Sequence, residues 1–251
     1  MRVALIGQRR NIAPVVILIF GYLEIKRKPI PYWLKKKIKI DKSHHHHTVF
    51  QWHEFIVENH YDFVNVYAHR SSSELEAVFK EAGRDKTCFV KVNGEKVYLP
   101  SYNLHALFLI KHMVSHFASE FITLRHILDW AFFAKRYSDK INWEWLQRIL
   151  DDYHMKDFFN CINAICIEEL GFESSIFPEV IFLPSLKDKI FIDVMNPQFT
   201  CEEPRGFFKR LLYKYKRWEK NAWKQNLCYK ESRFETFLYG IWAHIIKPSS
   251  L

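Results

Sequence analysis

Two histidines in one predicted helix could take part in chemistry. His112 and His116 stand four residues apart within residues 104–118, so their imidazoles would share a helix face. This spacing suits two zinc ligands, but Met113 stands where the zinc proteases carry glutamate, which argues against that class. Together with Lys111, the two histidines could instead contact a phosphate. Three interpretations therefore stay open: packing or surface histidines, nucleotide or acceptor binding, and metal binding.

A second polar pair lies in the next predicted helix. Arg125 and Asp129 are also four residues apart, among apolar side chains. This is the spacing of an intrahelical ion pair, which contributes only about 0.2–0.5 kcal/mol when it is exposed. The pair is therefore expected to orient the helix.

A third candidate is the segment 205–223, which interleaves basic and aromatic side chains. Lysine and arginine contact phosphates, while phenylalanine and tyrosine stack on bases or insert into lipid. The pattern is typical of amphipathic membrane-surface helices and of RNA-binding surfaces. The alternative without a ligand is a docking helix whose aromatic stripe packs on its neighbours. We predict an anionic partner for this segment as the functional hypothesis.

Four consecutive histidines at 44–47 allow a native loop, a metal site or the remnant of an affinity tag. The run is internal and continues into a predicted strand, whereas tags usually stand at a terminus. These features favour the native loop.

The predicted secondary structure changes at Pro100 from mainly strands to helices. Strands are favoured where β-branched and aromatic side chains dominate, at residues 15–22 and 48–67. A β-hairpin is predicted over residues 88–99, because Asn93-Gly94 separates two alternating runs. Residues 1–100 are therefore predicted to form a β-rich domain.

One helix is predicted within this first part, over residues 71–82. Ser72 or Ser73 can cap it, and Glu74 and Glu76 suit the positive end of the helix dipole. Its buried face would carry Leu75, Val78 and Phe79.

Helices dominate the second part, residues 101–251, where apolar residues recur at three- and four-residue spacing. The predicted helices cover residues 104–118, 122–136, 143–153, 156–170, 207–223 and 234–246. The sequence thus predicts an α+β protein whose second domain is helical.

Composition restricts the setting of the protein. The chain carries 37 lysines and arginines against 28 aspartates and glutamates, a formal net charge of +9 that favours anionic partners. Its 5 cysteines are an odd number without CxxC spacing, so neither a disulfide framework nor a zinc site is predicted. The apolar run 12–23 contains Pro14 and is shorter than the roughly 20 residues of a spanning helix. We expect a buried strand there, no transmembrane segment and a reducing, cytoplasmic compartment.

Several short segments form an ordered set in the first two thirds of the chain. They are residues 44–50 (HHHHTVF), 57–63 (VENHYDF), 92–95 (VNGE), 99–100 (LP), 107–112 (LFLIKH) and 124–131 (LRHILDWA). In order and spacing they resemble the uncharacterised bacterial nucleotidyltransferase family of the DNA polymerase beta superfamily, over about residues 44–172. The resemblance implies a small mixed sheet followed by a helical bundle.

The resemblance also implies transfer of a nucleoside monophosphate from a nucleoside triphosphate to a hydroxyl acceptor. In such enzymes two carboxylates one residue apart, and a third on a neighbouring strand, hold two Mg²⁺ ions. Glu58 resembles the third carboxylate and would be catalytic and a magnesium ligand; Glu54 takes that place if the register shifts by four residues. The nucleotide or acceptor side of the cleft would be lined by Lys111, His112, His116, Arg125 and Asp129.

The chain departs from this family pattern before Glu58. The acidic residues that precede it are Glu24, Asp41 and Glu54, and no Asp-x-Asp or Asp-x-Glu pair occurs among them. One carboxylate is too little charge for two Mg²⁺ ions. Two hypotheses follow: a nucleotidyltransferase whose paired carboxylates are missing, replaced or supplied elsewhere, and a non-catalytic binding or regulatory relative. The second would hold an anionic partner, a nucleotide, RNA or membrane, on its basic surface.

Overall fold

The structure is a computed structural model that describes most of the chain. The described residues are 2–5, 15–19, 39–41, 47–52, 55–60, 62–92, 94–197, 204 and 206–246. Some of the predictions fall on other residues, namely those for Glu54, for histidines 44–46 and for both ends of the apolar run 12–23, and these lie outside the described residues.

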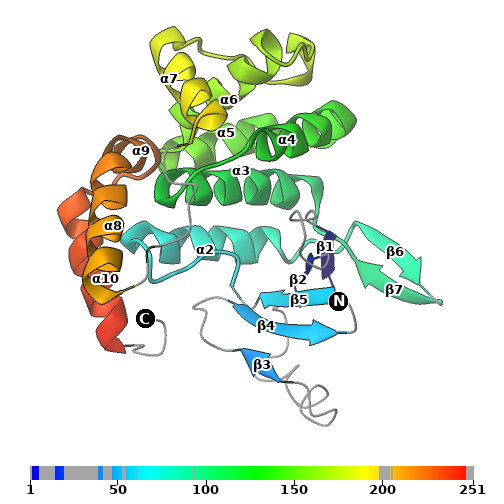
Figure 1. Ribbon diagram of the computed structural model, residues 1–251. Coiled ribbons are helices and arrows are strands. Elements are labelled where there is room, and N and C mark those ends of the chain that lie inside the picture. Colours follow the sequence, from blue (N-terminus) through cyan, green and yellow to red (C-terminus); the bar gives the residue numbers. More distant parts are fainter. Residues whose placement is uncertain are drawn as a thin grey trace. The chain divides into compact units, whose positions relative to one another are not determined.

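A five-stranded mixed sheet forms in the first part of the chain, with strand order β1-β2-β5-β4-β3 (Figure 1). The strands are β1 (Arg2–Leu5), β2 (Val15–Ile19), β3 (Ile40–Asp41), β4 (His47–Trp52) and β5 (Phe55–His60). β2 and β5 run parallel, and the other neighbours are antiparallel. Strands are confirmed within both predicted ranges, as β2 within residues 15–22 and as β4 and β5 in the first part of residues 48–67. Residues 62–67 form bends and a turn, so the strand prediction is wrong there.

The helix that follows the sheet, α2 (Arg70–Ala82), begins before the predicted serine caps. His69 occupies the N-cap position, without a side-chain cap hydrogen bond. Because Ser72 is the third residue of the helix and buried, the prediction that Ser72 or Ser73 caps it is wrong. Leu75 and Phe79 are buried, so the predicted apolar face is confirmed at these two residues.

The predicted hairpin is formed by β6 (Phe89–Val92) and β7 (Glu95–Tyr98). Gly94 in the turn has φ +84°, a backbone conformation that side chains with a Cβ rarely adopt. The sequence signal of the turn is thus confirmed.

Helices and the loops between them make up the rest of the described residues. The helices are α3 (Tyr102–Ser119), α4 (Leu124–Tyr137), α5 (Trp143–Asp152), α6 (Lys156–Glu168), α7 (Pro184–Met195), α8 (Phe207–Lys220), α9 (Ala222–Cys228) and α10 (Arg233–Ile246). Short 3₁₀ turns occur at Ser138–Lys140 and Ser174–Ile176. The protein has the predicted α+β fold, a mixed sheet followed by helices.

Two helical predictions need correction. Residues 207–223 do not form one helix, because the chain breaks at Asn221 between α8 and α9. The Asn221 side chain is buried and donates to the carbonyl of Ser119 at 3.2 Å, a long-range contact that local spacing does not reveal. α7 was not predicted; it begins with Pro184, which suits the first turn of a helix.

The chain divides into two compact units by its internal contacts. The sheet unit contains residues 1–104 and 234–251, and the helical unit contains residues 105–233. α10 belongs to the sheet unit, where Tyr239 donates from its hydroxyl to the carbonyl of Val66 at 3.5 Å. The predicted division into domains 1–100 and 101–251 stays a prediction.

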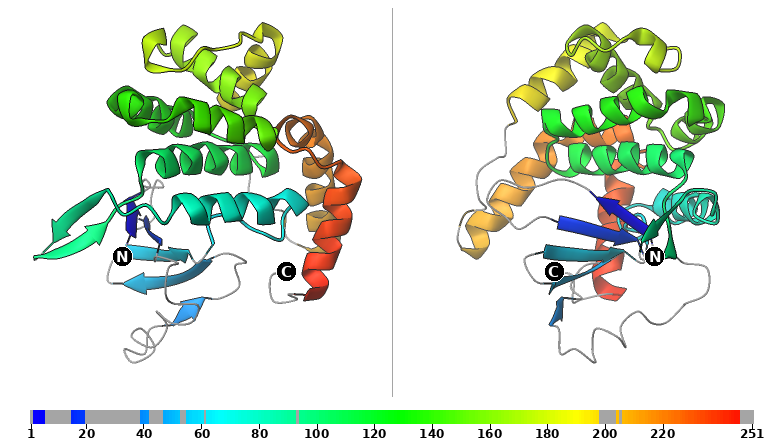
Figure 2. Two further views of the ribbon diagram at one scale, coloured as in Figure 1. Left: turned by 180° about the vertical axis from the view of Figure 1, so that it is seen from behind. Right: turned by 90° about the vertical axis from the view of Figure 1, so that its right-hand side faces the viewer.

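The helical unit has a closed core. Trp130 of α4 is fully buried, and its indole N–H donates to the Asn163 side chain of α6 at 2.8 Å. Figure 2 shows α3 and α4 side by side in both of its views, with α6 among the helices of the same unit. None of the helices in the described ranges is long and apolar enough to cross a membrane.

Candidate functional site

Glu58 lies within β5, as the family resemblance requires. Its register partners are Ile17 of β2 and Val49 of β4. Val49 pairs in turn with Asp41 of β3, so one register row contains Asp41, Val49, Glu58 and Ile17 in neighbouring strands. We call this set the Glu58 row. It contains a second acid, Asp41, that sequence reasoning did not connect with Glu58.

The two acids of the Glu58 row do not converge at the backbone. Neighbouring strands lie about 4.8 Å apart, so Asp41 and Glu58 are separated by about 10 Å across Val49. A magnesium ion holds its oxygen ligands at about 2.1 Å. The next described positions on the same face are not acidic: Val15, Ile56 and Gln51 on one side, and Ile19, His60 and His47 on the other. These positions therefore do not fit a resident pair of magnesium ions.

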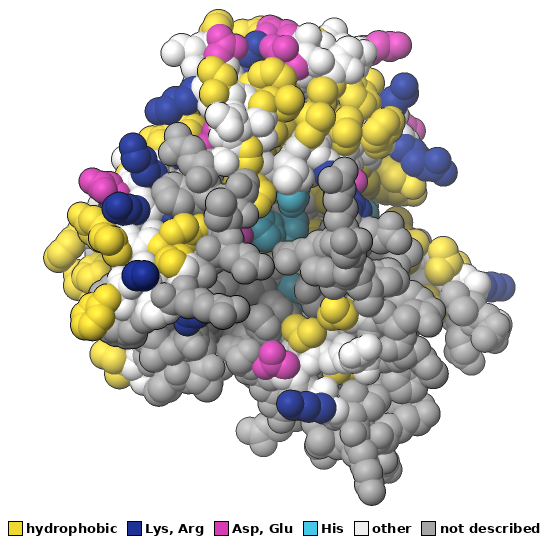
Figure 3. Space-filling view, in the orientation of Figure 1, with side chains coloured by type: hydrophobic (Ala, Val, Ile, Leu, Met, Phe, Trp, Pro, Cys, Tyr) yellow, Lys and Arg dark blue, Asp and Glu magenta, His cyan; other side chains and the backbone are white. Residues whose placement is uncertain are grey.

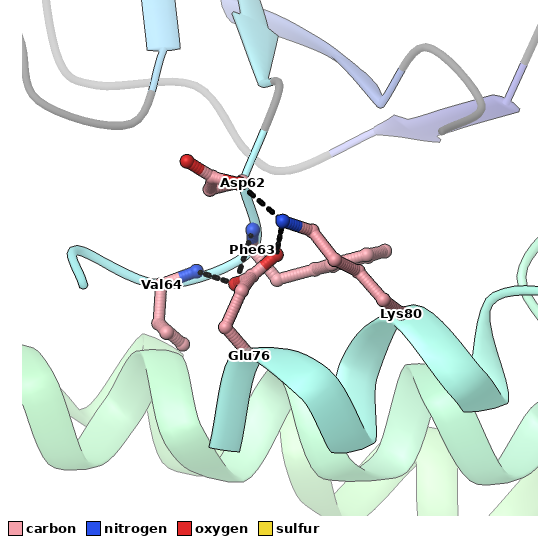
Figure 4. A network of polar contacts seen from close by, with 5 residues as sticks. All are labelled: Asp62, Phe63, Val64, Glu76 and Lys80. Atoms are coloured by element: carbon pink, nitrogen blue, oxygen red, sulfur yellow. Dashed lines mark hydrogen bonds and ion pairs between the residues drawn. The ribbon is translucent and has the colours of Figure 1, made fainter. Parts of the chain in front are cut away.

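A buried carboxylate fixes the chain directly after β5 (Figure 4). Glu76 of α2 accepts hydrogen bonds from the backbone N–H groups of Phe63 and Val64, both at 2.9 Å. Lys80, one helical turn later, lies 3.3 Å from Glu76 and 2.6 Å from Asp62. The expected interaction of Glu76 with the helix dipole is thus wrong: its side chain ties the segment after β5 to α2.

Burial governs the protonation of this carboxyl group. The pKa of Glu76 is raised from 4.5 to about 7, chiefly by desolvation. The N–H groups of Val64 and Phe63 and the ammonium of Lys80 oppose the rise, and Asp62 adds to it. Only 2% of Glu76 is exposed, so the group acts as a structural acceptor. Because Phe63 and Val64 follow β5 closely, the two hydrogen bonds of Glu76 fix the chain at the end of the strand that contains Glu58.

On the helical unit, the structure brings together three imidazoles. His112 and His116 of α3 have ring centroids 4.5 Å apart, and His126 of α4 lies 6.2 Å and 5.6 Å from them. We call these residues the histidine cluster. All three are half-buried, and Figure 3 shows histidine side chains gathered at the surface on one face of the molecule.

The arrangement of the histidine cluster does not favour metal binding. His126 Nδ1 accepts from the backbone N–H of Thr123 at 3.1 Å, so a neutral His126 ring carries its proton on Nε2. In the part of the chain that the structure describes, no three His, Cys, Asp or Glu side chains are placed to hold a metal ion. The zinc interpretation of His112 and His116 therefore has no support there.

The other predicted binding residues differ in accessibility. Lys111 is buried, and its ammonium donates to the Tyr229 hydroxyl at 3.1 Å and lies over the Tyr229 ring. Its ammonium therefore interacts within the fold. Arg125 and Asp129 form the predicted ion pair at 3.8 Å, with roughly half of each side chain exposed. Burial raises the pKa of Asp129, and Arg125 lowers it. Arg125 directly precedes His126 in α4.

The comparison with protein families identifies the chain. The model of an uncharacterised nucleotidyltransferase family matches residues 21–171, which is more than half of the chain. The chain belongs to this nucleotidyltransferase family. The match covers the Glu58 row from β3 onward, α2 and the histidine cluster, and it confirms the family predicted from the short segments. No curated protein and no solved structure gave a significant match.

Sequence reasoning missed three residues that the structure connects with the nucleotidyltransferase candidates. Asp41 joins the Glu58 row because β3 pairs with β4. β3 has only two residues, too few to be recognised as a strand from the sequence. Glu76 makes a contact 13 residues back along the chain, which spacing does not reveal. His126 did carry a local signal, because it stands three residues after Thr123, the spacing of a capping box.

Proposed function

We propose that this member of the nucleotidyltransferase family binds a nucleoside triphosphate without transferring its nucleoside monophosphate to a hydroxyl acceptor. The observation that carries the proposal is the Glu58 row, in which Asp41 and Glu58 are separated by the apolar Val49. Two-metal transfer needs several converging carboxylates to hold and place the ions. The strand that separates the two acids argues against two-metal transfer, and membership of the nucleotidyltransferase family supports a nucleotide as the ligand.

The histidine cluster and Arg125 are the proposed phosphate contacts. The guanidinium of Arg125 is about half exposed. The half-buried imidazole of His126 lies in the same helix, α4, and those of His112 and His116 lie in α3. Guanidinium and imidazole N–H groups form strong hydrogen bonds with phosphate oxygens and require no metal ion. A nucleoside triphosphate as ligand also fits the cytoplasmic location predicted from the sequence.

Calorimetry and a transfer assay test the two halves of this proposal. We expect binding heat with at least one of the four nucleoside triphosphates, both with and without Mg²⁺, and no transfer of labelled nucleoside monophosphate. The absence of heat with all four nucleotides would overturn the binding half. Mg²⁺-dependent transfer that is lost in Glu58→Gln would overturn the other half, and Glu54→Gln tests the shifted register in the same assay.

A matched pair of variants locates the phosphate site. Arg125→Ala should weaken nucleotide affinity roughly tenfold, because a hydrogen bond to a charged group is lost. Lys135→Ala removes the same charge from the exposed surface of the same helix and should leave affinity unchanged. Equal losses in both variants would show that only general charge matters and would count against this site.

A further inference from the structure

α8 exposes its apolar side. Phe208, Leu212, Tyr215 and Trp218 follow one another at spacings of four, three and three residues, so they lie along one side of the helix. Their exposed fractions are 81%, 54%, 55% and 37%. Figure 3 shows hydrophobic and basic side chains next to each other in the region of α8. We call these four residues the α8 stripe.

The polar side of α8 faces the helical unit. Tyr213 and Arg217, on the side opposite the stripe, are the half-buried residues of this helix among those described. The guanidinium of Arg217 lies 3.7 Å from the Glu120 carboxylate. A surface helix of a globular protein normally buries its apolar side. α8 does the reverse at Phe208, Leu212 and Tyr215, which are more than half exposed. Trp218, at the end of the stripe, lies under the guanidinium of Arg233 at 3.8 Å.

The charge of α8 indicates what covers the stripe. The helix contains one acid, Glu219, against six basic residues: Lys209, Arg210, Lys214, Lys216, Arg217 and Lys220. At 100° per residue, Lys209 and Lys216 lie beside one edge of the stripe and Lys214 beside the other. Long basic side chains in such positions reach lipid headgroups while the apolar residues between them enter the acyl boundary. The surface is therefore complementary to an apolar layer with an anionic border.

We propose that α8 docks this protein on the surface of membranes that contain anionic lipids, with the helix lying in the plane of the interface. The 14 residues of α8 span about 21 Å, less than the roughly 30 Å of a bilayer core, so the helix lies on the membrane. Single-stranded RNA would use the basic residues and the aromatic rings, but aliphatic Leu212 at the centre of the stripe offers no stacking platform. A lipid surface uses all four stripe residues. The proposal is independent of nucleotide binding.

Vesicle co-sedimentation of the full chain tests the docking. We expect binding to phosphatidylcholine vesicles with about one third phosphatidylserine, and weak binding to phosphatidylcholine alone, because each basic residue near an anionic surface strengthens binding about fivefold. Added salt should weaken the association. Equal binding to both kinds of vesicle, or no binding to either, would overturn the proposal.

A matched pair of substitutions tests the stripe itself. Leu212→Glu should reduce binding to the anionic vesicles at least about tenfold, because it removes a leucine that would enter the membrane and adds a charge of the same sign as the lipids. Ile192→Glu makes the same type of change at an exposed apolar residue of α7 and should leave binding unchanged. Equal losses in both variants would refute a specific role for α8.

Two further measurements separate the alternatives. Circular dichroism should show the same helix content and thermal midpoint for both variants, since each residue is more than half exposed. A filter assay with single-stranded RNA gives the competing answer: RNA binding without vesicle binding would replace the lipid by a nucleic acid and overturn the proposal. Nucleotide calorimetry on Leu212→Glu should match the unchanged chain, so failure of the docking proposal is distinguishable from failure of the proposed function.

Discussion

Burial shifts the pKa values of Glu76 in the sheet unit and of His105 in the helical unit in opposite directions. In the sheet unit, desolvation raises the pKa of Glu76 from 4.5 to about 7. In the helical unit, desolvation lowers the pKa of His105, which lies beside Phe133, from 6.5 to about 4. Both shifts favour the neutral form of the group. We therefore expect pH to change the stabilities of the two units in opposite directions.

The signs follow from proton linkage. The folded sheet unit holds the proton of Glu76 more tightly than the unfolded chain does, so its contribution is full below about pH 4.5 and is lost as the pH rises towards 7. The folded helical unit holds the proton of His105 less tightly. Its contribution is therefore full above about pH 6.5 and is lost as the pH falls towards 4.

The greatest loss of stability is expected from a substitution in the core of the helical unit. Trp130→Ala should lower the free energy of unfolding of that unit by about 3–5 kcal/mol, because it removes a fully buried indole and leaves the Asn163 carbonyl without its donor. Hydrogen exchange should show faster exchange in α4 and α6 and little change in α2. Trp130→Phe, which keeps the ring but not the N–H, should cost less. Uniform loss of protection in both units would show that they unfold together.

The pH response of the sheet unit should depend on one carboxyl group. A pKa raised from 4.5 to about 7 corresponds to a loss of about 3 kcal/mol as the pH rises through this range. Glu76→Gln should flatten that slope, since an amide does not titrate but its oxygen still accepts from Phe63 and Val64. Glu81→Gln, at an exposed residue of the same helix, should leave the slope unchanged. Exchange of α2 amides against pH provides the measurement.

The acid side of the comparison depends on His105. His105→Leu should remove the loss of helical-unit stability between about pH 6.5 and pH 4, because no imidazole remains to be protonated in the unfolded state. Thermal unfolding at each pH, monitored by hydrogen exchange of the α4 amides, measures the change. A variant that keeps the acid-side loss would assign it to other groups and remove the contrast between the units.

The smallest expected effect concerns Arg125. Its ion pair with Asp129 is about half exposed, so Arg125→Ala should lower the free energy of unfolding by only about 0.2–0.5 kcal/mol. The same variant is expected to lose roughly tenfold in nucleotide affinity. Chemical denaturation measures the first quantity. A loss of stability above about 1 kcal/mol would mean that the residue serves the fold more than a ligand.

Much of the fold could be predicted from the sequence because its signals are local. The Asn93-Gly94 turn and the periodic apolar residues of α3 to α6 indicate their structures over a few residues. α7 escaped prediction because apolar Ile192 and Met195 are exposed, so the helix has no clean buried stripe. The break at Asn221 depends on the distant Ser119, which no local pattern contains.

The candidate site was predictable only in part, for the same reason. The strand of Glu58 and the shared face of His112 and His116 follow from local spacing and family resemblance. Strand register is set by contacts between distant segments, so the place of Asp41 in the Glu58 row could not be read from the sequence. The role of Glu76 likewise depends on a turn of the fold that brings Phe63 and Val64 to its side chain.

The spacing of the Glu58 row also suggests an experiment that adds a third carboxylate to it. Val49 is half-buried between Asp41 and Glu58, so Val49→Asp would create three acids on adjacent strands, about 4.8 Å apart. Their mutual repulsion should lower the melting temperature in chelator, and Mg²⁺ or Mn²⁺ should restore it. Thermal shift with and without the cation measures this rescue, and Val49→Asn is the uncharged control. A single engineered carboxylate would thus create a cation site in this sheet.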